Sequence, residues 1–414
     1  MDNKASLYTE IEGGVCAASG FKAYGIHAGM RKNAAKLDLA MIVASEVCNA
    51  AGVYTKNKVF ASPVGVTRAH LANGRAQAVI CNSGNANACT PDGYETATET
   101  CTAVAEALGI DQNDVIVAST GVIGVSLNTE PIKKGIPVLI EKLDDTAEGS
   151  DKAALAIMTT DTKKKEFAFE FECGGQLVHL GGICKGSGMI HPNMGTMLCF
   201  ITTDCAISSE ALNVALHAAI ENTFNMVTVD GDTSTNDMVT VLASGRAGNE
   251  PIVSADGESY EVFAGALALL CKKLATAIAA DGEGATKLLI CKVNGARCDA
   301  DARILAKSVI ASSLVKAAMF GSDANWGRVI CALGYSGVEF DTKKVDISFS
   351  SDKGTLLVCK NGGSYEFSEE LAKLVLSRDT VTITCEMNDG TATAEAYGCD
   401  LSYEYVRING DYRS

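Results

Sequence analysis

The residues near the middle of the chain, 185–204, change character abruptly at one peptide bond. Residues 185–195, KGSGMIHPNMG, are rich in glycine, proline and polar side chains, which favour turns and exposed backbone. Residues 196–202, TMLCFIT, are typical of a buried strand. A threonine, Thr196, therefore stands directly after Gly195 at the predicted start of a strand, and this constrains both the local fold and its chemistry.

The position of Thr196 suits nucleophilic chemistry. A hydroxyl is a weak nucleophile until a base removes its proton, and an N-terminal α-amine has a pKa of ~8, which matches neutral pH. The hydroxyl would create that amine by attacking the Gly195 carbonyl, forming an ester that water hydrolyses. Gly195 lacks a Cβ and permits the strained backbone that such an attack requires. The same residues also fit a plain glycine turn before a core strand, and the spacing alone favours that interpretation.

The length and composition are those of a globular protein. The 414 residues suffice for one large or two medium domains, with 47% hydrophobic and 21% charged residues. The formal net charge of −15 disfavours nucleic acid or an anionic membrane as a partner. The N-terminus lacks the apolar segment of a signal peptide, and the most apolar predicted helix, residues 260–280, carries Glu261, Lys272 and Lys273. We expect a cytoplasmic protein that does not cross a membrane.

The sixteen cysteines show no zinc-like spacing, because no C-x-x-C pair and no Cys/His cluster occurs. Most of them lie in apolar runs, among them Cys81, Cys291, Cys331 and Cys385. We expect small core residues in a reducing compartment. Residues 226–237 are rich in acidic and hydroxyl side chains, but the EF-hand spacing is absent, which favours a structural or substrate-facing loop. No bound metal is predicted.

A second candidate segment is residues 115–124, VIVASTGVIG, which is predicted to be a strand that runs into a glycine turn. Backbone N–H groups in such a turn, together with the Thr120 hydroxyl, can stabilise an oxyanion by ~3 kcal/mol for each donor. Many strand ends look like this one, so the segment alone is weakly specific.

Other polar segments allow both plain and functional interpretations. Residues 159–162, TTDT, are typical of a cap or turn, and Lys163, Lys164 and Lys165 are predicted to form a solvated face. Lys185, beside its glycine-rich turn, suits a substrate carboxylate. Glu283 lies between two glycines in residues 281–287, DGEGATK, where a helix is expected to end. His191, on a proline-flanked turn, is interpreted as incidental.

These segments, in this order, resemble the glutamate N-acetyltransferase family of arginine biosynthesis, also called ornithine acetyltransferase. The matching segments are 119–124, 159–162, 185–198, 281–287 and 408–414. The resemblance covers nearly the whole chain. Gly195 and Gly410 replace alanines that are usual in that family, and the first change reduces steric hindrance at the proposed cleavage site.

The resemblance implies a role for each matching position. Thr196 would be the nucleophile and contact the substrate, and cleavage between Gly195 and Thr196 would give chains 1–195 and 196–414. Thr120 and Gly121 would form the oxyanion hole. The remaining substrate-binding residues would be Thr159, Lys185, Glu283, Asn409 and Ser414.

The implied reaction is a ping-pong transfer of acetyl from N²-acetyl-L-ornithine to Thr196 and then to L-glutamate. No cofactor is required, because the enzyme itself carries the acetyl group. The sequence leaves open whether acetyl-CoA is a second acetyl donor, which would add N-acetylglutamate synthase activity. The alternatives are a related self-cleaving aminopeptidase or amidohydrolase and a non-enzymatic anion-binding protein. The two pieces would assemble as a heterotetramer or larger.

We expect an α+β fold, in which a layered αββα-type sandwich is followed by a smaller C-terminal α/β domain. The main domain would span residues 1–290 and the smaller one residues 291–414, with its tail docked at the active site. The residue patterns predict separate strands at 37–45 and 51–55 and one helix over residues 302–320.

Overall fold

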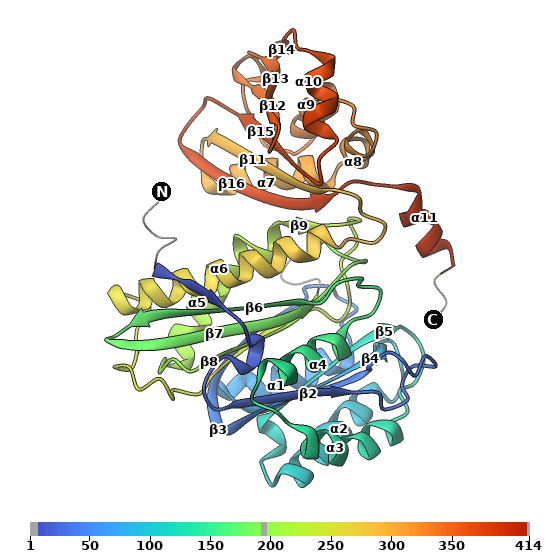
Figure 1. The fold of residues 1–414 in the computed structure, drawn as a ribbon, viewed down its shortest axis with the longest axis vertical. Coiled ribbons are helices and arrows are strands. Elements are labelled where there is room, and N and C mark those ends of the chain that lie inside the picture. Colours follow the sequence, from blue (N-terminus) through green and yellow to red (C-terminus); the bar gives the residue numbers. More distant parts are fainter. Residues whose placement is uncertain (1–6, 192–196, 412–414) are drawn as a thin grey trace.

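The computed structural model of the protein describes residues 7–191 and 197–411. Within these ranges the strands form two sheets, which lie one above the other in Figure 1. The larger sheet has the order β1-β6-β7-β8-β10-β3-β4-β5, and β2 pairs with β3 outside this path. The smaller sheet has the order β14-β13-β12-β15-β11-β16-β9.

The larger sheet consists of β1 (Thr9–Ile11), β2 (Phe21–Ile26), β3 (Leu39–Tyr54), β4 (Arg75–Asn85), β5 (Val115–Val122), β6 (Lys165–Cys173), β7 (Gln176–Lys185), β8 (Leu198–Thr203) and β10 (Met238–Ala243). The smaller sheet consists of β9 (Val227–Thr228), β11 (Leu288–Ala296), β12 (Asp346–Ser351), β13 (Gly354–Lys360), β14 (Gly363–Ser364), β15 (Thr380–Glu386) and β16 (Ala392–Cys399). The predicted domain boundary at residue 290 stays a prediction.

The α-helices are α1 (Ser62–His70), α2 (Gly93–Leu108), α3 (Glu130–Lys142), α4 (Ala147–Ile157), α5 (Ser209–Glu221), α6 (Glu258–Ala280), α7 (Asp299–Ala311), α8 (Ser313–Phe320), α9 (Trp326–Gly334), α10 (Glu369–Leu376) and α11 (Tyr403–Gly410).

Strand β3 joins the two halves of the larger sheet. Its first part pairs with β2 and β4, and its last part pairs with β10. The register with β4 shifts between Val43 and Cys48, and an irregularity of this kind bends a strand. The prediction of separate strands at 37–45 and 51–55 was therefore wrong, because the chain continues through the bend as one strand.

Alternating side chains show how the strands are layered. Ile80 of β4 packs with α2 and α3, whereas its neighbour Cys81 lies in a core shared with the other half of the sheet. Phe200 of β8 lies in that same inner core, whereas Ile201 packs with α5 and α6. The order is therefore helices, strands, strands and helices. The predicted α+β, αββα-type architecture is confirmed.

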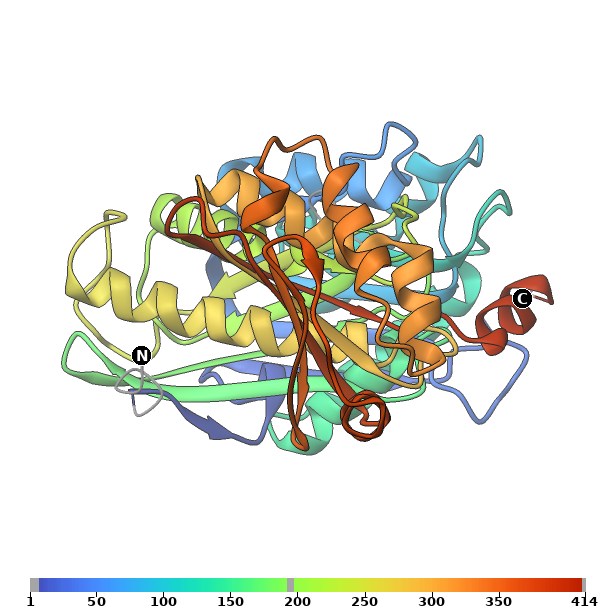
Figure 2. The ribbon, with the colours of Figure 1, turned by 90° about the horizontal axis from the view of Figure 1, so that it is seen from above.

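Helix α6 lies between the two sheets. It contacts β6 and β7 of the larger sheet and β11 and β16 of the smaller sheet, and it crosses below the C-terminal elements in Figures 1 and 2. By length and composition α6 could cross a membrane, with a mean hydropathy of 1.7. A helix that is covered on two sides needs apolar residues around most of its circumference, and this accounts for its composition.

Two local predictions were wrong. The predicted helix 302–320 is divided into α7 and α8, because Ser312 has an extended backbone and its hydroxyl accepts a hydrogen bond from Val315 N at 3.3 Å. Cys331 is exposed, since α9 directs Val329 and Leu333 into the core and leaves Cys331 on the opposite face. All the cysteines are free thiols, and all except Cys89, Cys298 and Cys331 are buried.

We expect Phe200→Ala to lower the free energy of unfolding by about 3–5 kcal/mol, because the ring fills the core between the two strand layers. Phe200 is 1% exposed. Leu177→Ala, at a position of β7 that is 50% exposed, is the matched control and should cost less than about 1 kcal/mol. Urea denaturation measures both. Equal losses in the two variants would contradict the layered packing.

Candidate active site

Six of the predicted site residues meet at one pocket of about 140 Å³. The pocket lies where β5 and β7 end, beside the turn that follows α6. Its lining consists of Ala86, Thr120, Gly121, Ile123, Thr159, Thr160, Lys185, Gly188, Met189, Ser234, Thr235, Asn236, Glu283 and Asn409. Segments that are far apart in the sequence are therefore brought together around a space that fits a small molecule.

Three predicted positions, Gly195, Thr196 and Ser414, lie outside the described residues. Met197 is the first described residue after residue 191. Its carbonyl oxygen accepts a hydrogen bond from Met238 N at 2.8 Å. The next residue, Leu198, pairs with Lys185 across β7 and β8. The start of β8 is thus joined directly to the strand that carries Lys185.

Thr120 and Gly121 lie at the end of β5. Gly121 has a φ of +134°, and a Cβ at this position would overlap the backbone of Gly84 in β4. A glycine is therefore required for the two strands to approach this closely. Asn236 fixes the same strand from the other side, because its Nδ2 donates to Ser119 O at 2.8 Å and to Ala86 O at 2.6 Å.

Lys185 is the last residue of β7 and is 8% exposed. It forms no ion pair with any residue in the described part of the chain. Burial raises the pKa of the nearby Asp161 carboxyl, but the positive charges of Lys185 and Lys165 lower it more, so that the pKa lies well below its ordinary value. The ammonium group of Lys185 therefore faces the pocket without a direct carboxylate partner, and it is suited to an incoming anion.

Glu283 supplies the negative charge of the pocket. Its backbone N–H donates to Ser187 O at 2.9 Å, which ties the turn after α6 to the turn after β7. Gly188 lets the carboxylate lie directly against the backbone, because a Cβ at that position would overlap it. One buried cation and one buried carboxylate thus line the same small space.

The C-terminal helix α11 reaches this pocket through polar contacts. Asn409 Nδ2 donates to Glu283 Oε2 at 2.8 Å, and Ser402 Oγ donates to Gly284 O at 2.5 Å. Burial first, and then the charge of Asp230, raise the pKa of Tyr405 on the same helix. No residue of α11 is buried, and besides these polar contacts the Tyr403 ring packs edge-on against Phe320 of α8, with 5.6 Å between the ring centroids. In Figure 1 the helix projects from the side of the molecule.

Sequence reasoning missed several parts of the site. Ser234, Thr235 and Asn236 line the pocket, which fits a substrate-facing loop at residues 226–237, but the sequence singled out none of these three residues. Lys165 is 2% exposed, so the prediction that it belongs to a solvated face was wrong. Lys163 and Lys164 are exposed as expected, whereas Lys165 points inward as the first residue of β6.

Histidine and metal chemistry receive little support from the described residues. His191 is not among the pocket-lining residues, and its Nδ1 lies 2.9 Å from Thr228 Oγ1. Burial, followed by the charge of Lys307, lowers the pKa of His191 to about 4, so its ring is neutral at neutral pH. Over residues 7–191 and 197–411, no group of three His, Cys, Asp or Glu side chains could hold a metal ion.

Comparison with known proteins identifies the family. The ArgJ family matches residues 22–414 of the chain. The chain belongs to the ArgJ family. It is 50% identical to the arginine biosynthesis bifunctional protein ArgJ of Symbiobacterium thermophilum, covering 98% of this chain and 99% of the relative. It is 46% identical to the glutamate N-acetyltransferase of Methanosarcina mazei, covering 97% and 99%.

A solved structure, the arginine biosynthesis bifunctional protein argJ of Bacillus halodurans, is 46% identical to this chain. The match has a TM-score of 0.49 and covers 51% of this chain and 98% of that chain.

We expect Gly188→Ala to displace the Glu283 carboxylate and break its contact with Asn409. Because the displaced group is the end of a flexible side chain, the free energy of unfolding should change by less than about 1 kcal/mol. Hydrogen exchange of the α11 amides should nevertheless become faster. Gly334→Ala, where an added Cβ meets no atom within 4 Å, is the control. Unchanged exchange in α11 would show that this contact does not hold the helix.

Proposed function

We propose that this chain transfers acetyl from N²-acetyl-L-ornithine to L-glutamate through an acetyl ester on Thr196. The observation that carries the proposal is the meeting of Lys185, Glu283 and the Thr120–Gly121 turn at one small pocket of an ArgJ-family chain. Relatives named glutamate N-acetyltransferase and arginine biosynthesis bifunctional protein ArgJ match over nearly the full chain length, and they support the same reaction.

The charges of the pocket complement those of an amino acid. Lys185 pairs with the substrate carboxylate, and Glu283 pairs with the ammonium group of ornithine. Thr159 and Asn409 line the same space and can donate further hydrogen bonds to the substrate. Ser414 is assigned to the substrate by the family resemblance alone.

In the first half-reaction, the Thr196 α-amine accepts the hydroxyl proton while Oγ attacks the acetyl carbonyl carbon. The negative charge that develops on the carbonyl oxygen is stabilised by Thr120 and by the N–H groups of the turn at Gly121, a type of interaction worth about 3 kcal/mol per donor. The amide C–N bond then breaks. The leaving ornithine amine takes the proton from the Thr196 ammonium group.

In the second half-reaction, the amine of glutamate attacks the acetyl ester. The Thr196 α-amine takes a proton from the attacking amine and passes it to Oγ as the ester C–O bond breaks, and N-acetyl-L-glutamate leaves. No cofactor takes part, because the acetyl group stays on the protein between the two steps. Acetyl-CoA as a second donor is a separate proposal, supported by the word bifunctional in the relatives' names.

The free α-amine of Thr196 requires cleavage of the Gly195–Thr196 bond. We propose that the Thr196 hydroxyl attacks the Gly195 carbonyl, that the C–N bond breaks to leave an ester and the free amine, and that water then hydrolyses the ester. The two pieces would remain together, because β7 of the first piece pairs with β8 of the second, and β3 pairs with β10. Their assembly as a heterotetramer and a cytoplasmic location are further parts of the proposal.

We expect Thr196→Ala to remain one uncut chain without acetyl transfer, because the nucleophile is absent. Thr196→Ser, the matched control, should be cut and retain partial turnover. Gel electrophoresis measures cleavage, and an assay of N-acetylglutamate formed from acetylornithine and glutamate measures transfer. Net release of acetate without N-acetylglutamate would indicate a hydrolase instead. Normal turnover by Thr196→Ala would contradict the assignment of the nucleophile.

A further inference from the structure

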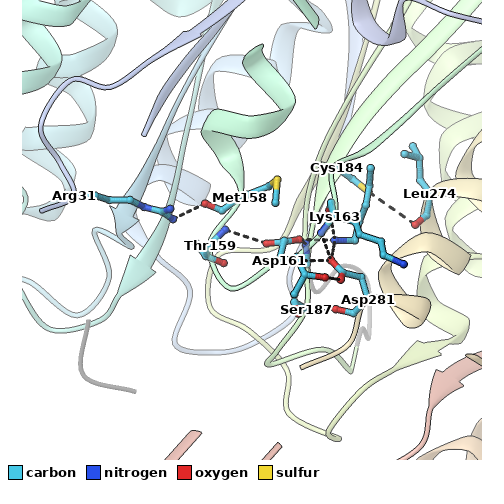
Figure 3. Close-up of polar contacts among 12 residues, drawn as sticks. Arg31, Met158, Thr159, Asp161, Lys163, Cys184, Ser187, Leu274 and Asp281 are labelled. Atoms are coloured by element: carbon cyan, nitrogen blue, oxygen red, sulfur yellow. Dashed lines mark hydrogen bonds and ion pairs between the residues drawn. The ribbon is translucent and has the colours of Figure 1, made fainter. Parts of the chain in front are cut away.

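A buried lysine lies between two buried carboxylates behind the pocket. Lys165 Nζ is 2.7 Å from Asp161 Oδ1 and 2.6 Å from Asp281 Oδ2. The side chains are 1%, 0% and 5% exposed for Lys165, Asp161 and Asp281. None of the three residues is among those lining the pocket. Figure 3 shows Asp161 and Asp281 close to each other, with Thr159 and Ser187 nearby.

Asp161 connects two segments of the pocket wall. Its Oδ2 accepts a hydrogen bond from Thr159 N at 3.0 Å, and its Oδ1 accepts one from Gly186 N at 2.7 Å. Thr159 lines the pocket, and Gly186 directly follows Lys185. One carboxylate therefore fixes the backbone at Thr159 and next to Lys185, two residues that line the pocket.

Asp281 connects the same region to the end of α6. Its carboxylate accepts from Thr162 N at 3.0 Å, from Lys163 N at 3.2 Å and also from the Thr162 hydroxyl. Its backbone oxygen accepts from Ser187 Oγ at 2.6 Å. Glu283 follows Asp281 by two residues. The ion pairs of Lys165 with Asp161 and Asp281 therefore also hold the segment that carries the Glu283 carboxylate into the pocket.

Electrostatics link this group to Lys185. The positive charges of both Lys185 and Lys165 lower the pKa of Asp161, whereas Asp281 forms an ion pair with Lys165. Two carboxylates thus lie close to two lysines, and the negative charge of Asp161 acts on Lys185, which has no direct ion pair in the described part of the chain. If Asp161 were neutral, the charge of Lys185 would be less well compensated and less favourable at its buried position.

Stability alone is a weak explanation for such a group. Removing two carboxylates and an ammonium from water is costly, and apolar residues of similar volume often stabilise a fold as well or better. The hydrogen bonds of this group go instead to two segments that line or adjoin the pocket, the loop at Thr159 and the turn at Gly186 and Ser187. This distribution indicates that the group fixes the geometry and charge of a binding site.

We infer that Asp161, held by Lys165 and Asp281, is a positioning residue that orients and electrostatically supports Lys185 for recognition of the substrate carboxylate. The inference rests on the proposed function for the identity of the substrate. It adds a residue outside the pocket lining whose effect is specific to one functional group of the ligand.

The test compares ornithine with ornithinamide, in which a neutral amide replaces the carboxylate. Titration calorimetry measures both dissociation constants and needs no turnover. The wild-type protein should bind ornithine at least about 10-fold more tightly, as expected for a charge-assisted contact. In Asp161→Asn this ratio should fall to within about 2-fold, mainly through weaker ornithine binding. Asp161→Asn keeps the Lys165–Asp281 pair and should therefore fold.

Asp151→Asn is the matched control. Asp151 lies ten residues earlier and pairs with the exposed Lys164, so its substitution should leave the ratio unchanged. Ser187→Ala is a second variant that removes the bond from the turn to Asp281 without altering any charge, and it should lower the ratio in the same direction.

Three results would overturn the inference. They are an unchanged ratio in Asp161→Asn, an equal loss of affinity for both ligands, and a wild-type protein that does not distinguish the two ligands. The second result would assign Asp161 a purely structural role. Failure of the proposed function is a separate outcome, because a protein that binds ornithine selectively but does not transfer acetyl would leave this inference standing.

Discussion

The ammonium group of Lys165, enclosed by two carboxylates, is the interaction on which the pocket most depends. Its partners, Asp161 and Asp281, lie in a loop before β6 and at the end of α6, and both elements belong to the packed core. Buried charges must be paired and hydrogen-bonded to be tolerated. Here the required pairing joins the core to the pocket, because the same two residues also bond the turns around the site.

The formation of the pocket also depends on places where two backbone segments, or a backbone segment and a side chain, approach closely. Gly121 allows β5 to approach β4, and Gly188 allows the Glu283 carboxylate to lie against a turn. Gly284, with a φ of +71°, lets the backbone of α11 come near. Each glycine makes room for polar groups that belong to different parts of the chain. The ion pairs of Lys165 with Asp161 and Asp281 hold these segments in place. The glycines let the segments come close enough to form one small pocket.

The sequence predicted the local chemistry better than the long-range connections. The strand and turn at 115–124 and the loop at 281–287 are recognisable locally, the family resemblance assigned them to the site, and Thr120, Lys185 and Glu283 meet at one pocket. The continuous β3 could not be predicted, because pairing with β10 carries it through the bend. Lys165 resembled its exposed neighbours, since its two carboxylate partners are recognisable only in three dimensions. Asn236 was missed for the same reason, because the carbonyls it binds lie more than a hundred residues away.

The central claim is that an acetyl group is carried on Thr196 between donor and acceptor. The most direct test is intact-mass spectrometry of the purified protein after incubation with acetylornithine in the absence of glutamate. The account predicts chains 1–195 and 196–414, with one added acetyl group on Thr196 of the second chain that disappears when glutamate is supplied. An uncleaved chain that nevertheless transfers acetyl, or an active protein whose second chain never gains the acetyl group, would contradict it.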